Sequence, residues 1–341
     1  MNSYRLLVSL TCLLLLFGIG TLAQDDDSPF TIDFNGDPVI ERGDWNEWDG
    51  RFTSVGTVFY HDGQFHLFRN GYPNWPRPSG IAYHISDDGI TWTEVGDLPV
   101  IAPEVVEEAG FDVDTALVYS GLVTEDGTWM LYFQAFVPDW GDVPGGVILA
   151  TADDPTGEWT IHDEMVIIPD ADSWENGAIG APSVVVVDGE YRMYYHGRDG
   201  GGIGVATSPD GFVWTKHDDP TTTEPPYALS DPIFLPAEDE DAWDAESIYD
   251  PTVAITPDGF VMAYSANPGV SGHGLAISED GMNFERLQQE PLFQQTDLDI
   301  IRDFWLVRMA YHDERYFFFA EINNRSGTDI YMDTLDGLLT E

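Results

Sequence analysis

Three carboxylates in this 341-residue chain stand just ahead of short apolar segments: Asp114, Glu246 and Asp250. Two carboxyl groups can hydrolyse a glycosidic bond, because one protonates the leaving oxygen while the other activates water or attacks the sugar. Carboxylates that crowd into one negative pocket raise the pKa of one member, which supplies an acid at neutral pH. We therefore take these three residues as the candidate catalytic groups.

Other polar residues occupy positions that recur along the chain but change in type. Three residues after a recurring aromatic stand Arg51, Asp114, Gly177, Glu246 and Arg302, and four residues further on stand Val55, Val118, Ala181, Asp250 and Leu306. The following strand ends in Arg69, Gln134, His196, Ser265 and Glu321. Paired strands return to the same end of a hairpin, so we expect these sets to converge. They form a binding pocket, or else a ring of solvated loop residues around a water-filled channel.

From these positions and their neighbours we predict eight substrate-binding residues: Arg51, Arg69, Gln134, Glu175, His196, Arg302, Asp303 and Trp305. Arg51 and Arg302 could hold a carboxylate ionised, or bind an acidic sugar or a phosphate in bidentate fashion. His196 is either a proton carrier or a hydrogen-bonding pocket residue. Glu175 belongs to aromatic–acid pairs such as Trp174-Glu175, which either pack inside the fold or form a rim that stacks on sugar rings.

The elements that must position these residues are strands. Asp-Gly turns between apolar runs are a strong hairpin signal, and they recur at Asp62-Gly63, Asp126-Gly127, Asp188-Gly189 and Asp258-Gly259, with a degenerate copy at Asp313-Glu314. A second hairpin follows each one, and its turn aspartates, Asp88, Asp154, Asp210, Asp280 and Asp336, are spaced by 66, 56, 70 and 56 residues. Five units of four antiparallel strands predict an all-β, five-bladed β-propeller, with no helical run.

The repeat Ser208-Pro-Asp-Gly-Phe-Val-Trp-Thr215 resembles the blade repeats of five-bladed glycosidases in glycoside hydrolase families 43, 32 and 130. This resemblance covers nearly the whole chain after its N-terminal segment, and it implies the same fold and action on carbohydrate. The residues that match the three family 43 carboxylates are Val55, Ser120 and Gly180, none of which ionises. The fold therefore resembles these enzymes, whereas their standard carboxylates do not carry over.

The N-terminus has the pattern of a signal peptide. Arg5 precedes an apolar run over 6–19, and small residues near Ala23 suit cleavage. An uncleaved anchor is the alternative reading of this short run. We expect a signal peptide over 1–23, an acidic segment over 24–36 and the propeller over 37–341, in a protein that is secreted, either extracellular or periplasmic. Cys12, the single cysteine, lies inside the apolar run, so no disulfide is expected.

The charge balance narrows the set of partners. With 61 acidic and 13 basic residues the chain has a net charge of −48, which repels nucleic acid and anionic membranes. Structural Ca²⁺ bound by aspartates is conceivable, although no Asp-x-Asp-x-Asp-Gly loop is present. No cofactor and no transition-metal site are expected, because the histidines are dispersed.

We expect a secreted glycoside hydrolase-like enzyme acting on an extracellular oligosaccharide or polysaccharide. A non-catalytic propeller that binds glycan or protein is the main alternative. A purely structural surface protein is the third reading.

Overall fold

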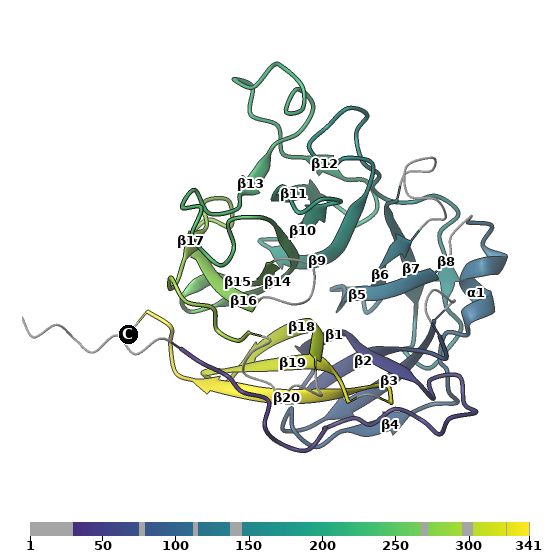
Figure 1. The fold of residues 1–341 in the computed structure, drawn as a ribbon. Helices are drawn as coiled ribbons and strands as arrows, with labels where there is room; N and C mark the ends of the chain where they lie inside the picture. Colours follow the sequence, from purple (N-terminus) through teal and green to yellow (C-terminus); the bar gives the residue numbers. More distant parts are fainter. Residues whose placement is uncertain are drawn as a thin grey trace, which may run out of the picture.

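The computed structural model describes residues 30–74, 79–111, 115–136, 145–266, 272–294, 303–324 and 326–340, apart from the side chains of Glu107 and of residues 303–305. Its strands form five antiparallel sheets that stand as blades around a common axis (Figure 1). The predicted five-bladed propeller is therefore confirmed.

Each blade begins with an inner strand and continues outward in chain order. Blade one contains β1 (Phe52–His61), β2 (Gln64–Tyr72), β3 (Gly80–Ser86) and β4 (Thr93–Val95). Blade two contains β5 (Thr115–Val123), β6 (Trp129–Phe136), β7 (Val147–Ala152) and β8 (Thr160–Ile161). Blade three contains β9 (Ile179–Val187), β10 (Glu190–Gly197), β11 (Ile203–Ser208), β12 (Thr215–Lys216) and a fifth strand, β13 (Pro232–Phe234), which pairs with β11. Blade four contains β14 (Ile248–Thr256), β15 (Gly259–Ala266), β16 (Gly272–Ser278) and β17 (Glu285–Arg286).

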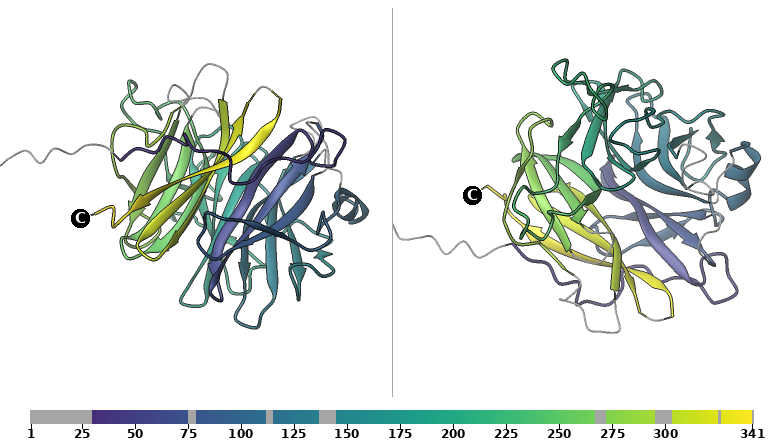
Figure 2. Two further views of the ribbon diagram at one scale, coloured as in Figure 1. Left: turned by 90° about the horizontal axis from the view of Figure 1, so that it is seen from below. Right: turned by 45° about the horizontal axis from the view of Figure 1, so that its top comes forward.

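Blade five has three strands of its own, β18 (Asp303–His312), β19 (Arg315–Asn323) and β20 (Thr328–Asp336). The N-terminal segment completes it, because Ile40 bridges Ile330 of β20 through backbone hydrogen bonds in both directions. An ion pair of 2.7 Å between Arg42 and Asp329 fastens the same segment. Figure 2 shows this segment in purple along the yellow strand β20. The two ends of the described chain thus close the ring.

The same segment contributes to the core before residue 37. Ile32 and Phe34 are buried, and the Phe34 ring packs edge-on against Phe293 with ring centroids 4.9 Å apart. Residues 30–36, which the sequence suggested as an acidic tail, therefore lie on blade four as part of the propeller.

The hairpin turns follow from the Asp-Gly pairs. Asp62 and Gly63 have φ angles of 47° and 89°, and Asp188 and Gly189 have 51° and 82°. Two successive left-handed residues match the twist of the flanking strands, and aspartate and glycine tolerate them best. Glu314, the degenerate member, takes the same conformation with φ of 58°.

One element was not predicted, the six-residue helix α1 (Pro103–Glu108) between blades one and two. Pro103 suits the first turn of a helix, where a missing N–H costs nothing. In the described part of the chain, no helix has the length and apolar character that a bilayer crossing needs.

The second hairpins of blades one, three and four share a turn that serves the scaffold. Asp280 accepts backbone N–H bonds from Met282 and Asn283, and Ser278 accepts one from Gly281. Asp88 and Asp210 have the same arrangement, and these bonds lower the pKa of Asp88 to about 2. The Ser-x-Asp-Gly pieces are therefore structural turns.

Candidate functional site

Polar side chains from the ends of the second strands link neighbouring blades at the axis. Three of these links are backbone N–H bonds accepted from the inner strand of the next blade: Val118 N–H to Asn70 Oδ1 at 2.8 Å, Ala181 N–H to Gln134 Oε1 at 2.9 Å and Asp250 N–H to His196 Nδ1 at 3.0 Å. Ser265 and Glu321 hold the equivalent position in blades four and five. The structure thus places Ala181 beside Gln134 and Asp250 beside His196, which are members of the two recurring sets.

Asp250 is the carboxylate of this ring that the structure describes most fully. It lies at a bulge of β14 with φ of 51°, and its side chain is 17% exposed. Ser265 Oγ donates a hydrogen bond of 2.9 Å to Oδ2, and His196 Nδ1 lies 3.9 Å from Oδ1. Aspartate tolerates the left-handed conformation better than most residues, so the bulge aims a carboxylate at the axis.

His196 is neutral in this arrangement. Burial lowers the pKa of His196, although the charge of Asp250 opposes the effect. Since Nδ1 accepts the Asp250 N–H, the neutral ring holds its proton on Nε2. Tyr249 contacts the ring edge-on with centroids 5.2 Å apart. These contacts favour a hydrogen-bonding pocket residue over a proton carrier.

Two further residues on the axis carry chemistry. Arg308 of β18 is 2% exposed, and its guanidinium lies 4.5 Å from the centre of the Tyr119 ring. The charges of Asp250 and Glu321 both act on Tyr119, whose pKa is raised chiefly by burial. Neither Arg308 nor Tyr119 was predicted from the sequence. The signal for Arg308 was a charge inside the apolar run Leu306-Val-Arg-Met-Ala310.

Gly180 explains why one family carboxylate is absent. It pairs with His196 across β9 and β10, and a Cβ at this position would overlap His196 Nε2 and lie 3.0 Å from Gln134 Nε2. A side chain at position 180 therefore requires the His196 ring to move from the position it has in this structure.

We predict that Gly180→Ala destabilises the protein by about 1–3 kcal/mol, because the new methyl group overpacks the axis. Urea unfolding measures this change. Gly201→Ala is the matched control, since a Cβ at Gly201 meets nothing within 4 Å. Equal effects of the two substitutions would contradict the prediction.

Arg69 was assigned to the pocket ring, and the structure places it in the scaffold. Its guanidinium forms an ion pair of 2.7 Å with Asp49, lies over Trp48 and donates to His84 Nε2 at 3.0 Å. The blade-one member of the ring is Asn70. In blade one Gly63 is the second residue of the turn, whereas in blade four Gly259 follows the turn and pairs with Thr256. An alignment of these two glycines therefore matches Ser265 with Arg69, one residue before the true equivalent, Asn70. A shift of one residue exchanges the faces of a strand.

The Arg69 contact makes His84 a source of acid sensitivity. Burial and the charge of Arg69 lower the pKa of His84 to about 3, below the ordinary 6.5. The unfolded chain therefore binds the proton first, so stability falls as the pH drops from about 6.5 toward 3, by at most about 1.4 kcal/mol per pH unit for one histidine.

We predict that His84→Gln reduces the slope of unfolding free energy between pH 6.5 and 4.5. Urea unfolding at several pH values measures this slope. His273 is buried with a similarly lowered pKa and maintains part of the slope. An unchanged slope in the variant would refute the assignment to His84.

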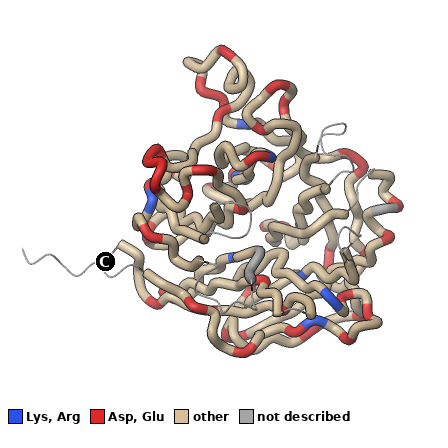
Figure 3. The backbone as a smooth tube through the Cα atoms, viewed as in Figure 1, with Lys and Arg blue, Asp and Glu red and all other residues tan. Residues whose placement is uncertain are grey.

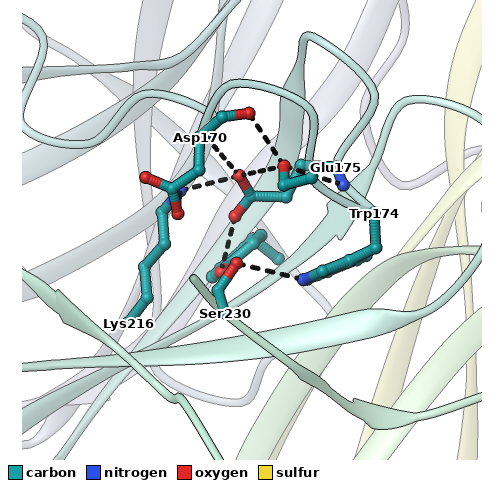
Figure 4. Close-up of polar contacts among 7 residues, drawn as sticks. Asp170, Trp174, Glu175, Lys216 and Ser230 are labelled. Carbon is teal, nitrogen blue, oxygen red and sulfur yellow. Dashed lines mark hydrogen bonds and ion pairs between the residues drawn. The ribbon is translucent and has the colours of Figure 1, made fainter. Parts of the chain in front are cut away.

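Glu175 was a candidate sugar contact, and the structure buries it completely. Its carboxylate pairs with Lys216 Nζ at 2.7 Å, accepts the Asp170 N–H at 2.6 Å and accepts the Tyr195 hydroxyl at 3.0 Å (Figure 4). Trp174 lies beside it and donates from Nε1 to Ser230 Oγ. Asp244 and Arg286 repeat this pair in blade four at 2.7 Å. The aromatic–acid pairs of blades three and four are therefore packing elements of the blades.

The remaining predicted residues lie in the loops that precede the inner strands, which we call the mouth of the propeller, or outside the described structure. Arg51 is half-buried, with its guanidinium 4.8 Å from the centre of the exposed Trp45 ring. Glu246 is exposed in the loop before β14, where its charge acts on Tyr249. Outside the described positions or side chains lie Asp114, Arg302, Asp303 and Trp305.

The described residues contain no group of three or more His, Cys, Asp or Glu side chains arranged to hold a metal ion. Structural Ca²⁺ stays a prediction. Acidic residues are spread over the whole backbone and far outnumber basic ones in Figure 3.

No protein-family model and no curated protein matches the sequence. Solved structures do match its fold. A glycosyl hydrolase from Bacteroides ovatus is 17% identical with a TM-score of 0.60, over 90% of this chain and 93% of that chain. A family 117 glycoside hydrolase from the marine bacterium Zobellia galactanivorans is 19% identical with a TM-score of 0.61, over 87% and 88%. A structure reported for the GH130 family, which contains hydrolases that target β-1,2-mannosidic linkages in Candida mannan, is 18% identical with a TM-score of 0.57, over 85% of each chain. The chain has the propeller fold of glycoside hydrolases.

Proposed function

We propose that this protein hydrolyses a glycosidic bond in an extracellular oligosaccharide or polysaccharide, with Asp250 as a catalytic carboxylate. One observation carries the proposal: Asp250 meets His196, Ser265 and the neighbourhood of Arg308 on the axis, where each blade contributes a different polar side chain. The similarity to glycoside hydrolase propellers along most of the chain supports the reaction class.

The chemistry needs a second carboxyl group. Glu321 holds the ring position of blade five and is 5% exposed. Glu246 stands at the mouth, and Asp114 stays a candidate from the sequence. We propose that Asp250 works with one of these three, while Arg51 and Trp45 contact the sugar at the mouth, since an exposed aromatic ring can stack on a sugar.

A glycan-binding propeller without catalysis is the second candidate. The observation that favours it is the absence of ionisable side chains at Val55, Ser120 and Gly180. The two candidates separate on turnover, because a binder retains glycan without releasing reducing ends.

The test is release of reducing sugar from a panel of plant, algal and microbial glycans by the folded protein. Affinity electrophoresis on the same panel reports binding. Hydrolysis of one glycan supports the proposed hydrolase, whereas retention without hydrolysis supports the glycan-binding propeller. If the protein neither hydrolyses nor retains any glycan of the panel, both candidate functions are excluded. We also propose secretion, on the strength of the signal-like segment over 1–23.

A further inference from the structure

A ring of hydroxyl groups surrounds the axis below the Asp250 level. Ser120 Oγ accepts the Val184 N–H at 2.9 Å, and Ser183 Oγ accepts the Val253 N–H at 2.9 Å. Thr252 Oγ1 accepts the Met309 N–H at 3.4 Å. In each case the donating N–H belongs to the residue that directly follows the next blade's counterpart of the hydroxyl residue. Val184 follows Ser183, Val253 follows Thr252 and Met309 follows Arg308. This register places five residues in one ring: Thr57, Ser120, Ser183, Thr252 and, in blade five, Arg308.

Arg308 breaks this hydroxyl pattern. The five residues line one channel of about 340 Å³ that runs along the second halves of the inner strands. We name it the axial channel. A side chain that differs in one blade of a repeat is a candidate for a function that the other blades lack.

The Arg308 guanidinium is buried with incomplete compensation. Nε donates to Gly56 O at 3.2 Å and Nη1 to Val307 O at 3.0 Å, while Nη2 has no hydrogen-bond partner within the described residues. No carboxylate in that part of the chain lies within ion-pairing distance of Arg308, although the charge of Asp250 acts on it. An unpaired buried charge is costly, so a compensating anion would stabilise this arrangement.

The surrounding groups suit a small anion. A hydroxyl oxygen that accepts one N–H still has its own O–H to donate, and Ser120, Ser183 and Thr252 are each in this state. Mostly apolar residues of the inner strands line the rest of the channel. The single positive charge of Arg308 balances one negative charge. A divalent anion would add an excess negative charge to a chain whose net charge is already −48.

We propose that the axial channel binds one small monovalent anion of the halide class between the Arg308 guanidinium and the hydroxyl ring. The site lies on the strand halves away from the mouth and is independent of the proposed hydrolysis. The carboxylate of an acidic sugar offers similar chemistry, so the experiment includes it as a separate arm.

The experiment measures thermal unfolding of the whole protein at constant ionic strength, with chloride, bromide or galacturonate replacing gluconate. We expect halide to raise the melting temperature by about 3–5 °C at saturation, and Arg308→Met to abolish the rise. Arg192→Met is the matched control, because Arg192 lies outside the channel lining and is partly exposed. A rise with galacturonate but not with halides would overturn the assignment.

Crystals of the wild-type protein grown in bromide give a readout that needs no variant. An anomalous peak in the axial channel beside the Arg308 guanidinium supports the site. The absence of a peak there at several hundred millimolar bromide would overturn it, as would equal melting temperatures in halide and gluconate.

Discussion

Asp250→Asn is expected to reduce glycoside hydrolysis by about 10²–10⁴-fold, the range for loss of a positioned acid or base. Asparagine has nearly the same shape and tolerates the left-handed φ of 51° at this bulge, so the fold should persist. The measurement is kcat/KM on a glycan that the wild-type protein hydrolyses, with a thermal melt as the folding check.

Ser265→Ala is the matched control for that substitution. It removes the 2.9 Å hydrogen bond to Asp250 Oδ2 but keeps the carboxylate, so we expect a smaller loss of activity, about tenfold or less, from one lost bond to a charged group. An Asp250→Asn variant that retains more than a tenth of the wild-type rate would remove Asp250 from the catalytic role. The function would then rest on Glu321, Glu246 or Asp114, or on binding alone.

The largest effect on stability is expected at Lys216. Lys216→Met removes the cation that faces the fully buried Glu175 carboxylate, and such a break costs about 3–5 kcal/mol because the remaining charge is left without its partner. Urea unfolding should show a lower midpoint with an unchanged slope.

Two variants make this test specific. In Lys216→Met combined with Glu175→Gln the buried position no longer carries a charge, and the other partner of Lys216, Asp170, is partly exposed, so part of the stability should return. Arg315→Met removes an exposed ion pair with Asp336 and should cost about 0–1 kcal/mol. A cost for Lys216→Met as small as that for Arg315→Met would show that the buried pair is not what stabilises blade three.

The number of blades was predictable from the sequence because the signal is local. Asp62-Gly63 and Asp188-Gly189 specify tight turns by backbone conformation, and a repeat of such turns defines strand pairing. Position within the ring was harder to predict. Arg69 and Asn70 are adjacent. The turn of blade four begins one residue earlier relative to its glycine than the turn of blade one, and this difference was enough to assign Arg69 to the ring in place of Asn70.

The candidate site could be inferred from the sequence where residues differ between blades at equivalent positions, as Gln134 differs from His196 and Asp250 from Ala181. The site could not be predicted where a residue's partners come from strands that are distant in the sequence. Nothing near Glu175 in the sequence indicates that Lys216 neutralises it, because that pairing depends on the twist that brings β12 beside the loop before β9. The N-terminal segment that completes blade five was not predicted for a similar reason, since Ile40 and Ile330 meet only when the ring closes.

The pairing of Ile40 with Ile330 also sets an order of events during synthesis. Blades one to four can form as the chain emerges, but their ring stays open until β20 has left the ribosome or the export channel. Until β18 has also emerged, the inner strand β1 lacks the neighbour that it contacts in the closed ring. An exported chain would therefore complete its tertiary structure only after translocation, on the far side of the membrane.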